Sequence, residues 1–113
     1  MEAAEKVASI PLPSVAAREA YTACLHAANA YVFERTGDVP RTHKGLHLRF
    51  RELCLRLGEI DIIHADFLQQ AYRLKENNDY GDRSAVTPES LPGIIASARA
   101  LIAAVEAALA PAP

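Results

Sequence analysis

Apolar residues return at the spacing of a single helix face along most of this chain. They recur every three or four positions from residue 14 to residue 110, and the alternation that marks strands is nearly absent. Breaks in the pattern fall at Gly37, at Gly58 and at the Asn77-Asn78 pair. Glycine and asparagine favour helix ends and turns. The pattern therefore predicts an all-α fold with four main helices.

The first two predicted helices have clear boundaries. Ser14 is suited to cap a helix that runs to about Thr36, and Pro40 marks the break that follows. Thr42 is a good cap for the second helix, which Gly58 ends. The residues predicted to face inward are Ala17, Tyr21, Cys24, Leu25, Ala28, Tyr31 and Val32 in the first helix, and Leu46, Phe50, Leu53, Cys54 and Leu57 in the second.

The last two helices are less sharply bounded. The third is predicted from about Ile60 to Asn77. The fourth opens either at Thr87-Pro88 or, because of Pro92, nearer Leu91, with residues 87–90 as a separate turn. The inward residues are predicted to be Ile63, Phe67, Ala71 and Leu74 in the third helix, and Ile94, Ile95, Ala98, Leu101, Ile102, Val105 and Leu109 in the fourth.

A chain of 113 residues without a long linker is expected to form one domain. Short connections favour antiparallel neighbours, so we expect an up-and-down four-helix bundle over residues 14–110. Residues 1–13 are expected to be partly helical, as a short fifth helix, or frayed. Much of the apolar content is alanine, which buries little area. Self-association is therefore expected.

Composition excludes several classes of protein. The net charge of −2 gives no overall nucleic-acid signal, although five cations cluster between Arg41 and Arg56 as either a solvated helix face or an anion-binding patch. Cys24 and Cys54 are expected to be free buried thiols, and no Cys/His spacing suggests a metal or cofactor. No signal peptide or membrane span is recognisable, so we expect a cytoplasmic protein.

The run from Tyr72 to Asp82 holds more polar groups than a helix end needs. Arg73 and Lys75 are candidate phosphate-binding cations, although two positions apart they diverge by about 200° on a helix. Asp79 is a candidate base, and Tyr80 a hydrogen-bond donor or stacking surface. The alternative is that Asp79 turns the chain and Tyr80 packs beneath the loop.

Two further groups of residues are candidates. His26 lies on a polar stripe of the first helix, which forms either a wet cleft or a solvated face. Thr42, His43 and Lys44 stand at a helix start, where outward amide groups attract phosphate. Alternatively, His43 is structural and bonds to a neighbouring helix. His47 is expected to be an ordinary surface residue.

The order of three short motifs resembles the HEPN superfamily (higher eukaryotes and prokaryotes nucleotide-binding), in its small stand-alone bacterial and archaeal branch. These motifs are Arg18-Glu19-Ala20-Tyr21 leading to His26-Ala27-Ala28, Thr42-His43-Lys44-Gly45, and Ala71-Tyr72 with Lys75 and Asp79-Tyr80. The resemblance implies a dimeric helical bundle. It also implies a metal-independent ribonuclease of a toxin–antitoxin or defence system, paired with a nucleotidyltransferase-fold antitoxin, which in related toxins attaches nucleotide to a nearby tyrosine, here Tyr80.

One departure from the family pattern keeps a second function open. The family's active motif is an Arg followed, after four to six residues, by a His near the end of the third main helix. After Arg73, Asp79-Tyr80 stands in place of that His. Arg41 and His47 match the spacing, but at another place in the fold, and one match is expected by chance. The alternative is a non-catalytic module that binds a nucleotide or the partner protein.

Overall fold

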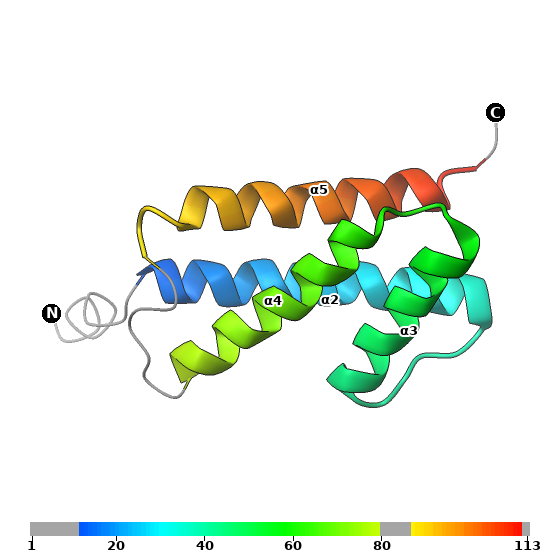
Figure 1. The fold of residues 1–113 in the computed structure, drawn as a ribbon, viewed down its shortest axis with the longest axis horizontal. Helices are drawn as coiled ribbons and strands as arrows, with labels where there is room; N and C mark the ends of the chain where they lie inside the picture. The colour runs from blue at the N-terminus through cyan, green and yellow to red at the C-terminus, as the bar shows by residue number, and fades with distance from the viewer. Residues whose placement is uncertain (1–11, 80–86, 112–113) are drawn as a thin grey trace, which may run out of the picture.

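The computed structural model describes residues 12–79 and 87–111, and the regular structure in these ranges is entirely helical. The helices are α2 (Leu12–Thr36), α3 (His43–Leu57), α4 (Ile62–Asp79) and α5 (Leu91–Leu109), as Figure 1 shows. The predicted all-α class is confirmed.

The start of α3 is fixed by a side-chain cap, as predicted. Thr42 has extended backbone angles, and its hydroxyl accepts a hydrogen bond of 2.9 Å from the amide of Gly45. A Cβ on Gly45 would lie only 2.9 Å from that hydroxyl and 3.2 Å from Cβ of Pro40, so glycine permits the close approach. At the other end, Gly58 adopts a φ of 69° and its amide donates to the carbonyl of Cys54.

The starts of α2 and α5 also follow from local chemistry. Helix α2 begins at Leu12, so Ser14 lies inside the helix and the predicted cap is wrong. Pro13 is tolerated there because amides of the first turn lack helical partners. Helix α5 begins at Leu91, as the second alternative predicted, and Thr87 and Ser90 exchange hydrogen bonds in a separate turn before it.

Figure 1 shows that α2 and α5 lie side by side and run in the same direction. Cys24 contacts the carbonyl of Ala98, and Arg35 contacts that of Ala108, so the register advances together along both helices. Helix α4 runs the opposite way. Antiparallel packing therefore holds for α3 with α4 and for α4 with α5, but α2 and α3 run in the same general direction, which the up-and-down order did not predict.

The loop from Gly37 to Thr42 explains this departure. It brings His43 beside Tyr21, which lies about 22 Å before the end of α2 at 1.5 Å per residue. An extended chain from Thr36 to His43 spans at most about 25 Å, just enough for the return. Helix α3 then starts again along the middle of α2.

The core confirms the predicted inner faces of α2 and α5 and, on α4, confirms Ala71 but corrects Ile63. The buried α4 residues are Ala65, Leu68 and Ala71, whereas Ile63 is 59% exposed. Neighbouring apolar residues on α4 are compatible with two different inward faces. The face that is buried contains the small residues Ala65 and Ala71, which let α4 pack closely on the core. Leu57 at the end of α3 is also exposed rather than inward.

Helix α5 is the most apolar helix of the described chain. Its length and composition would allow it to cross a membrane, although helices of soluble proteins meet the same criteria. It packs along α2 through Ala98, Leu101 and Val105.

A polar network joins the ends of α2 and α5 to the loop after α3. Glu59 accepts hydrogen bonds from the hydroxyl of Tyr31 at 2.8 Å and from two nitrogens of Arg35 at 2.8 and 2.9 Å. Arg35 also donates to the carbonyl of Ala108. Burial, and then Glu59, raises the pKa of Tyr31 to about 12, so this hydroxyl stays protonated and donates.

The Glu59 network should make stability depend on pH. The hydrogen bonds from Arg35 and Tyr31 lower the pKa of Glu59 below its ordinary value. A lowered folded-state pKa stabilises the fold above the unfolded pKa, near ~4.3, and this contribution is lost as the pH falls through the lowered value. Glu59→Gln should therefore lower the midpoint of urea unfolding at pH 7, with the difference shrinking below pH ~4. A difference that stays constant down to pH 3 would contradict this role.

Candidate functional site

The candidate site is centred on the hydroxyl of a buried tyrosine. Tyr21 lies on the inner face of α2 and is 1% exposed. Its hydroxyl oxygen lies 3.1 Å from Nδ1 of His43 and 3.1 Å from Nε2 of His47. The two histidines are one turn apart, on the same face of α3. One hydroxyl thus joins two imidazoles.

A second tyrosine, on α4, completes the group. The Tyr72 ring of α4 lies 5.6 Å from the Tyr21 ring, 5.5 Å from His43 and 5.4 Å from His47, between centroids. These are distances at which tilted and edge-to-face ring pairs are favourable. We call Tyr21, His43, His47 and Tyr72 the Tyr–His cluster; it draws on α2, α3 and α4.

A pocket of about 430 Å³ opens between α3 and α4 beside the cluster. Its size is within the range typical of small-molecule sites. We call it the α3–α4 pocket. It is lined by Lys44, His47, Leu48, Arg51, Ala65, Gln69, Tyr72 and Arg73. It therefore combines an imidazole, an aromatic ring, an amide and three cations.

The surroundings of His47 favour its neutral form near pH 7. It is half-buried, and burial is the largest cause that lowers its pKa below the ordinary value. The second cause is repulsion from a charge on His43. A neutral imidazole has one nitrogen that accepts a proton, so His47 can serve as a base.

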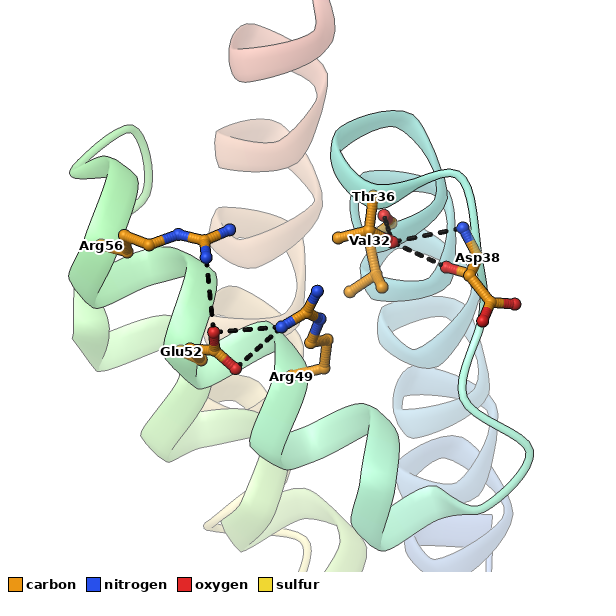
Figure 2. A network of polar contacts seen from close by, with 6 residues as sticks. All are labelled: Val32, Thr36, Asp38, Arg49, Glu52 and Arg56. Atoms are coloured by element: carbon orange, nitrogen blue, oxygen red, sulfur yellow. Dashed lines mark hydrogen bonds and ion pairs between the residues drawn. The ribbon is translucent and has the colours of Figure 1, made fainter.

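Ion pairs decide which pocket cations are available. Figure 2 shows Arg49 and Arg56 both pairing with Glu52 on the outer face of α3. Arg51 pairs with Asp66 of α4. Three of the five clustered cations therefore have carboxylate partners. Within the described residues, no ion pair involves Lys44 or Arg73, which leaves these two pocket cations for an anionic ligand.

Figure 2 also shows how the loop leaves α2. The Thr36 hydroxyl donates to the carbonyl of Val32 and contacts the backbone of Asp38. These bonds hold the first residues of the returning loop against the helix end. They fix the direction in which the chain goes back toward Tyr21.

The residues predicted at the start of α3 are brought together. Thr42 is the cap, His43 belongs to the Tyr–His cluster, and Lys44 lines the pocket. The structural alternative for His43, a bond to a neighbouring helix, is present in its contact with Tyr21. Arg73 of the other predicted group lines the same pocket.

Of the remaining predicted residues, His26 lies away from this site. His26 is exposed on α2, about 140° around the helix from Tyr21. Lys75 and Asp79 lie in the last turns of α4, but their side chains are outside the described part of the structure. Tyr80 lies outside the described residues altogether.

Three members of the site were not predicted from the sequence. His47 was expected at the surface, yet it is half-buried and contacts Tyr21. Tyr21 was assigned to the core stripe, where it does lie, but its hydroxyl was given no role. Tyr72 was noted only as part of a polar run. The available signal was the spacing of His43 and His47, which places two imidazoles on one helix face.

Other reactive groups contribute little in the described part of the chain. Burial raises the pKa of Cys24 and of Cys54 to about 11, so both thiols stay protonated and unreactive. Both are free, as predicted. Among the described residues, no group of three His, Cys, Asp or Glu side chains is arranged to hold a metal ion.

Comparison with known protein families places the whole bundle in one of them. The HEPN domain model matches residues 1–108. No curated protein and no solved structure matches the chain.

Proposed function

The chain belongs to the HEPN-domain family, and from this premise we propose that it cleaves unpaired RNA without a metal at the Tyr–His cluster. Membership supports a nuclease-like, RNA-related or toxin-like role at the level of the family. The observation that carries the finer proposal is the pair of imidazoles on one buried hydroxyl, beside a pocket that holds cations.

Metal-free cleavage of RNA needs three groups. A base removes the 2′-hydroxyl proton, an acid protonates the leaving 5′-oxygen, and a cation stabilises the phosphate. His47 is the base in this proposal because its pKa is lowered. His43, which is exposed one turn away, is the acid. Lys44 and Arg73 hold the phosphate.

The pocket also suits the base of one nucleotide. Tyr72 offers an aromatic ring for stacking, and the Gln69 amide can donate to or accept from a base edge. Such contacts require a base that is not stacked in a duplex, which favours unpaired RNA as substrate.

The direct test uses a short unpaired RNA with a fluorescent label, incubated with the protein in EDTA. We expect cleavage that leaves 2′,3′-cyclic phosphate ends. The same strand with a 2′-deoxy sugar at the cleaved position should remain intact because it lacks the nucleophile. Failure of the protein to cut any of a panel of RNA sequences would overturn the nuclease proposal.

Charge removal tests whether the phosphate lies in the pocket. Lys44→Ala/Arg73→Ala should weaken RNA binding and reduce its salt dependence, because two phosphate contacts are lost. Arg99→Ala, an exposed change on α5, serves as the control and should leave binding unchanged. A Lys75→Ala/Asp79→Ala variant tests the other predicted group; if it alone abolishes cleavage, the reacting groups are at the end of α4.

The second candidate is a module that binds a nucleotide or a partner protein without a reaction. The pairing of Arg51 with Asp66, which removes one pocket cation, favours it. Thermal stabilisation by RNA or ATP with no loss of intact RNA would support this alternative.

The proposal extends to assembly and cellular role. Leu48 and Leu55, two turns apart on α3, are 59% and 67% exposed, which supports a homodimer that covers this face. We place the protein in a cytoplasmic toxin–antitoxin or defence system, with a nucleotidyltransferase-fold antitoxin as its partner. A solution mass of one chain would contradict the dimer.

A further inference from the structure

We propose that the Tyr21 hydroxyl is a positioning group that makes the two imidazoles complementary, so that one presents an outward proton donor and the other an outward acceptor. This inference rests on the proposed function for its use in catalysis. Its structural part concerns only the protonation of two rings. It can therefore be tested whether or not RNA is cut.

Three polar atoms meet at the centre of the Tyr–His cluster. The hydroxyl of Tyr21 faces Nδ1 of His43 and Nε2 of His47, each at 3.1 Å. A hydroxyl has one proton to donate and accepts through its oxygen. If it donates to one of these inner nitrogens, it can accept only an N–H from the other. In a neutral pair in which the hydroxyl donates to one ring and accepts from the other, one inner nitrogen is therefore protonated and the other is not.

The protonation of the two outer nitrogens follows from that of the inner ones. Each neutral imidazole carries one proton, so a ring with a protonated inner nitrogen has a bare outer one. The outer atoms are Nε2 of His43 and Nδ1 of His47. In a pair joined in this way, one of them bears a proton while the other is an acceptor. The pair thus offers an acid and a base in one uncharged state.

This arrangement allows a balanced proton relay. Starting with protons on both Nε2 atoms, Nδ1 of His47 takes the 2′-hydroxyl proton while its Nε2 passes one to the oxygen of Tyr21. The hydroxyl gives its own proton to Nδ1 of His43, and Nε2 of His43 protonates the leaving 5′-oxygen. One proton enters and one leaves, and each ring ends with its proton on Nδ1.

The charged groups near the pair come from three helices. Cations line the neighbouring pocket from two helices, namely Lys44 and Arg51 on α3 and Arg73 on α4. Arg18 lies one turn before Tyr21 on α2. Tyr72 of α4 contacts both imidazole rings and adds no negative charge. Asp66 of α4 is paired with Arg51.

The test is the tautomeric state of the two histidines, measured by long-range ¹H–¹⁵N spectra of ¹⁵N-labelled protein above the pH at which both rings are neutral. Because the inner atoms are Nδ1 in one ring and Nε2 in the other, complementary rings must share the same tautomer. Both should carry the proton on Nδ1, or both on Nε2. A mixed pair, with Nδ1–H in one ring and Nε2–H in the other, would overturn the proposal.

Removal of the hydroxyl gives a second readout. Tyr21→Phe should lower the rate of RNA cleavage at saturation on the order of 10²-fold, with KM changed by less than about twofold. It should also flatten the pH profile because the two rings no longer exchange protons. Tyr31→Phe is the matched control, since it removes a buried tyrosine's hydrogen bond to Glu59, away from the cluster. An unchanged rate and profile in Tyr21→Phe would contradict the relay.

The two readouts separate the two proposals. If the two rings share a tautomer but the protein cuts no RNA, the proposed coupling through Tyr21 is supported and the proposed nuclease activity is overturned. A mixed tautomer pair in a protein that cuts RNA would do the reverse. Circular dichroism of Tyr21→Phe identifies loss of folding, and the spectra of the unaltered protein remain decisive in that event.

Discussion

Replacement of His47 with glutamine is expected to lower RNA cleavage by about 10²- to 10⁴-fold, which is the usual contribution of a general base. Glutamine keeps a polar group near the Tyr21 hydroxyl but has no basic nitrogen. The fold should therefore survive while proton abstraction fails. The measurement is the initial rate of cleavage of a labelled RNA at saturating concentration.

A pH profile sharpens this test. The pKa of His47 is lowered below its ordinary value, so His47 stays unprotonated and active to a lower pH than a free histidine. The rate should fall on the acid side only as the pH drops through this lowered pKa. His64→Gln provides the control, because His64 lines a separate hollow between α4 and α5. Equal rates in both variants would mean that His47 is not the base.

The largest expected effect on stability comes from Phe50. Its side chain is fully buried on α3, and its ring meets Tyr31 of α2 edge-on at 5.9 Å. Phe50→Ala should cost about 3–5 kcal/mol, through lost apolar burial and the cavity that remains. This is a large part of the stability of a small domain, about 5–15 kcal/mol. The free energy of unfolding in urea measures it.

A control on the same helix separates burial from helix propensity. Leu55 is 67% exposed, so Leu55→Ala should change the free energy of unfolding by about 0.5 kcal/mol or less in the isolated chain. Comparable losses in both variants would mean that α3 packs on another face. A loss confined to concentrated samples of Leu55→Ala would instead indicate that Leu55 is covered in a dimer.

Local signals explain why so much of the fold was predictable. The cap at Thr42, the left-handed Gly58 and the inner stripe of α2 depend on residues close together in sequence. Neighbouring apolar pairs made α4 ambiguous, because Ile62 and Ile63 belong to different faces one position apart. Only packing on the core selects between them, and single-sequence periodicity does not contain that information.

The site was less predictable because it is assembled by the direction of α3. The sequence indicated His43 and Lys44 through the chemistry of a helix start. It gave no reason to bring His47 to Tyr21, since an antiparallel α3 would place His47 elsewhere along α2. Tyr21 also looked like an ordinary core residue. A polar atom at the tip of a buried ring becomes recognisable only when its neighbours are known.

The early and late turns of helix α3 have different roles. The first two turns carry both imidazoles and a lysine of the pocket, while Phe50, Leu53 and Cys54 in later turns secure the domain. The proposed reacting groups can therefore be replaced without removing the side chains that hold the core together. A chain that keeps this core but carries other residues in the first two turns of α3 need not perform the same reaction.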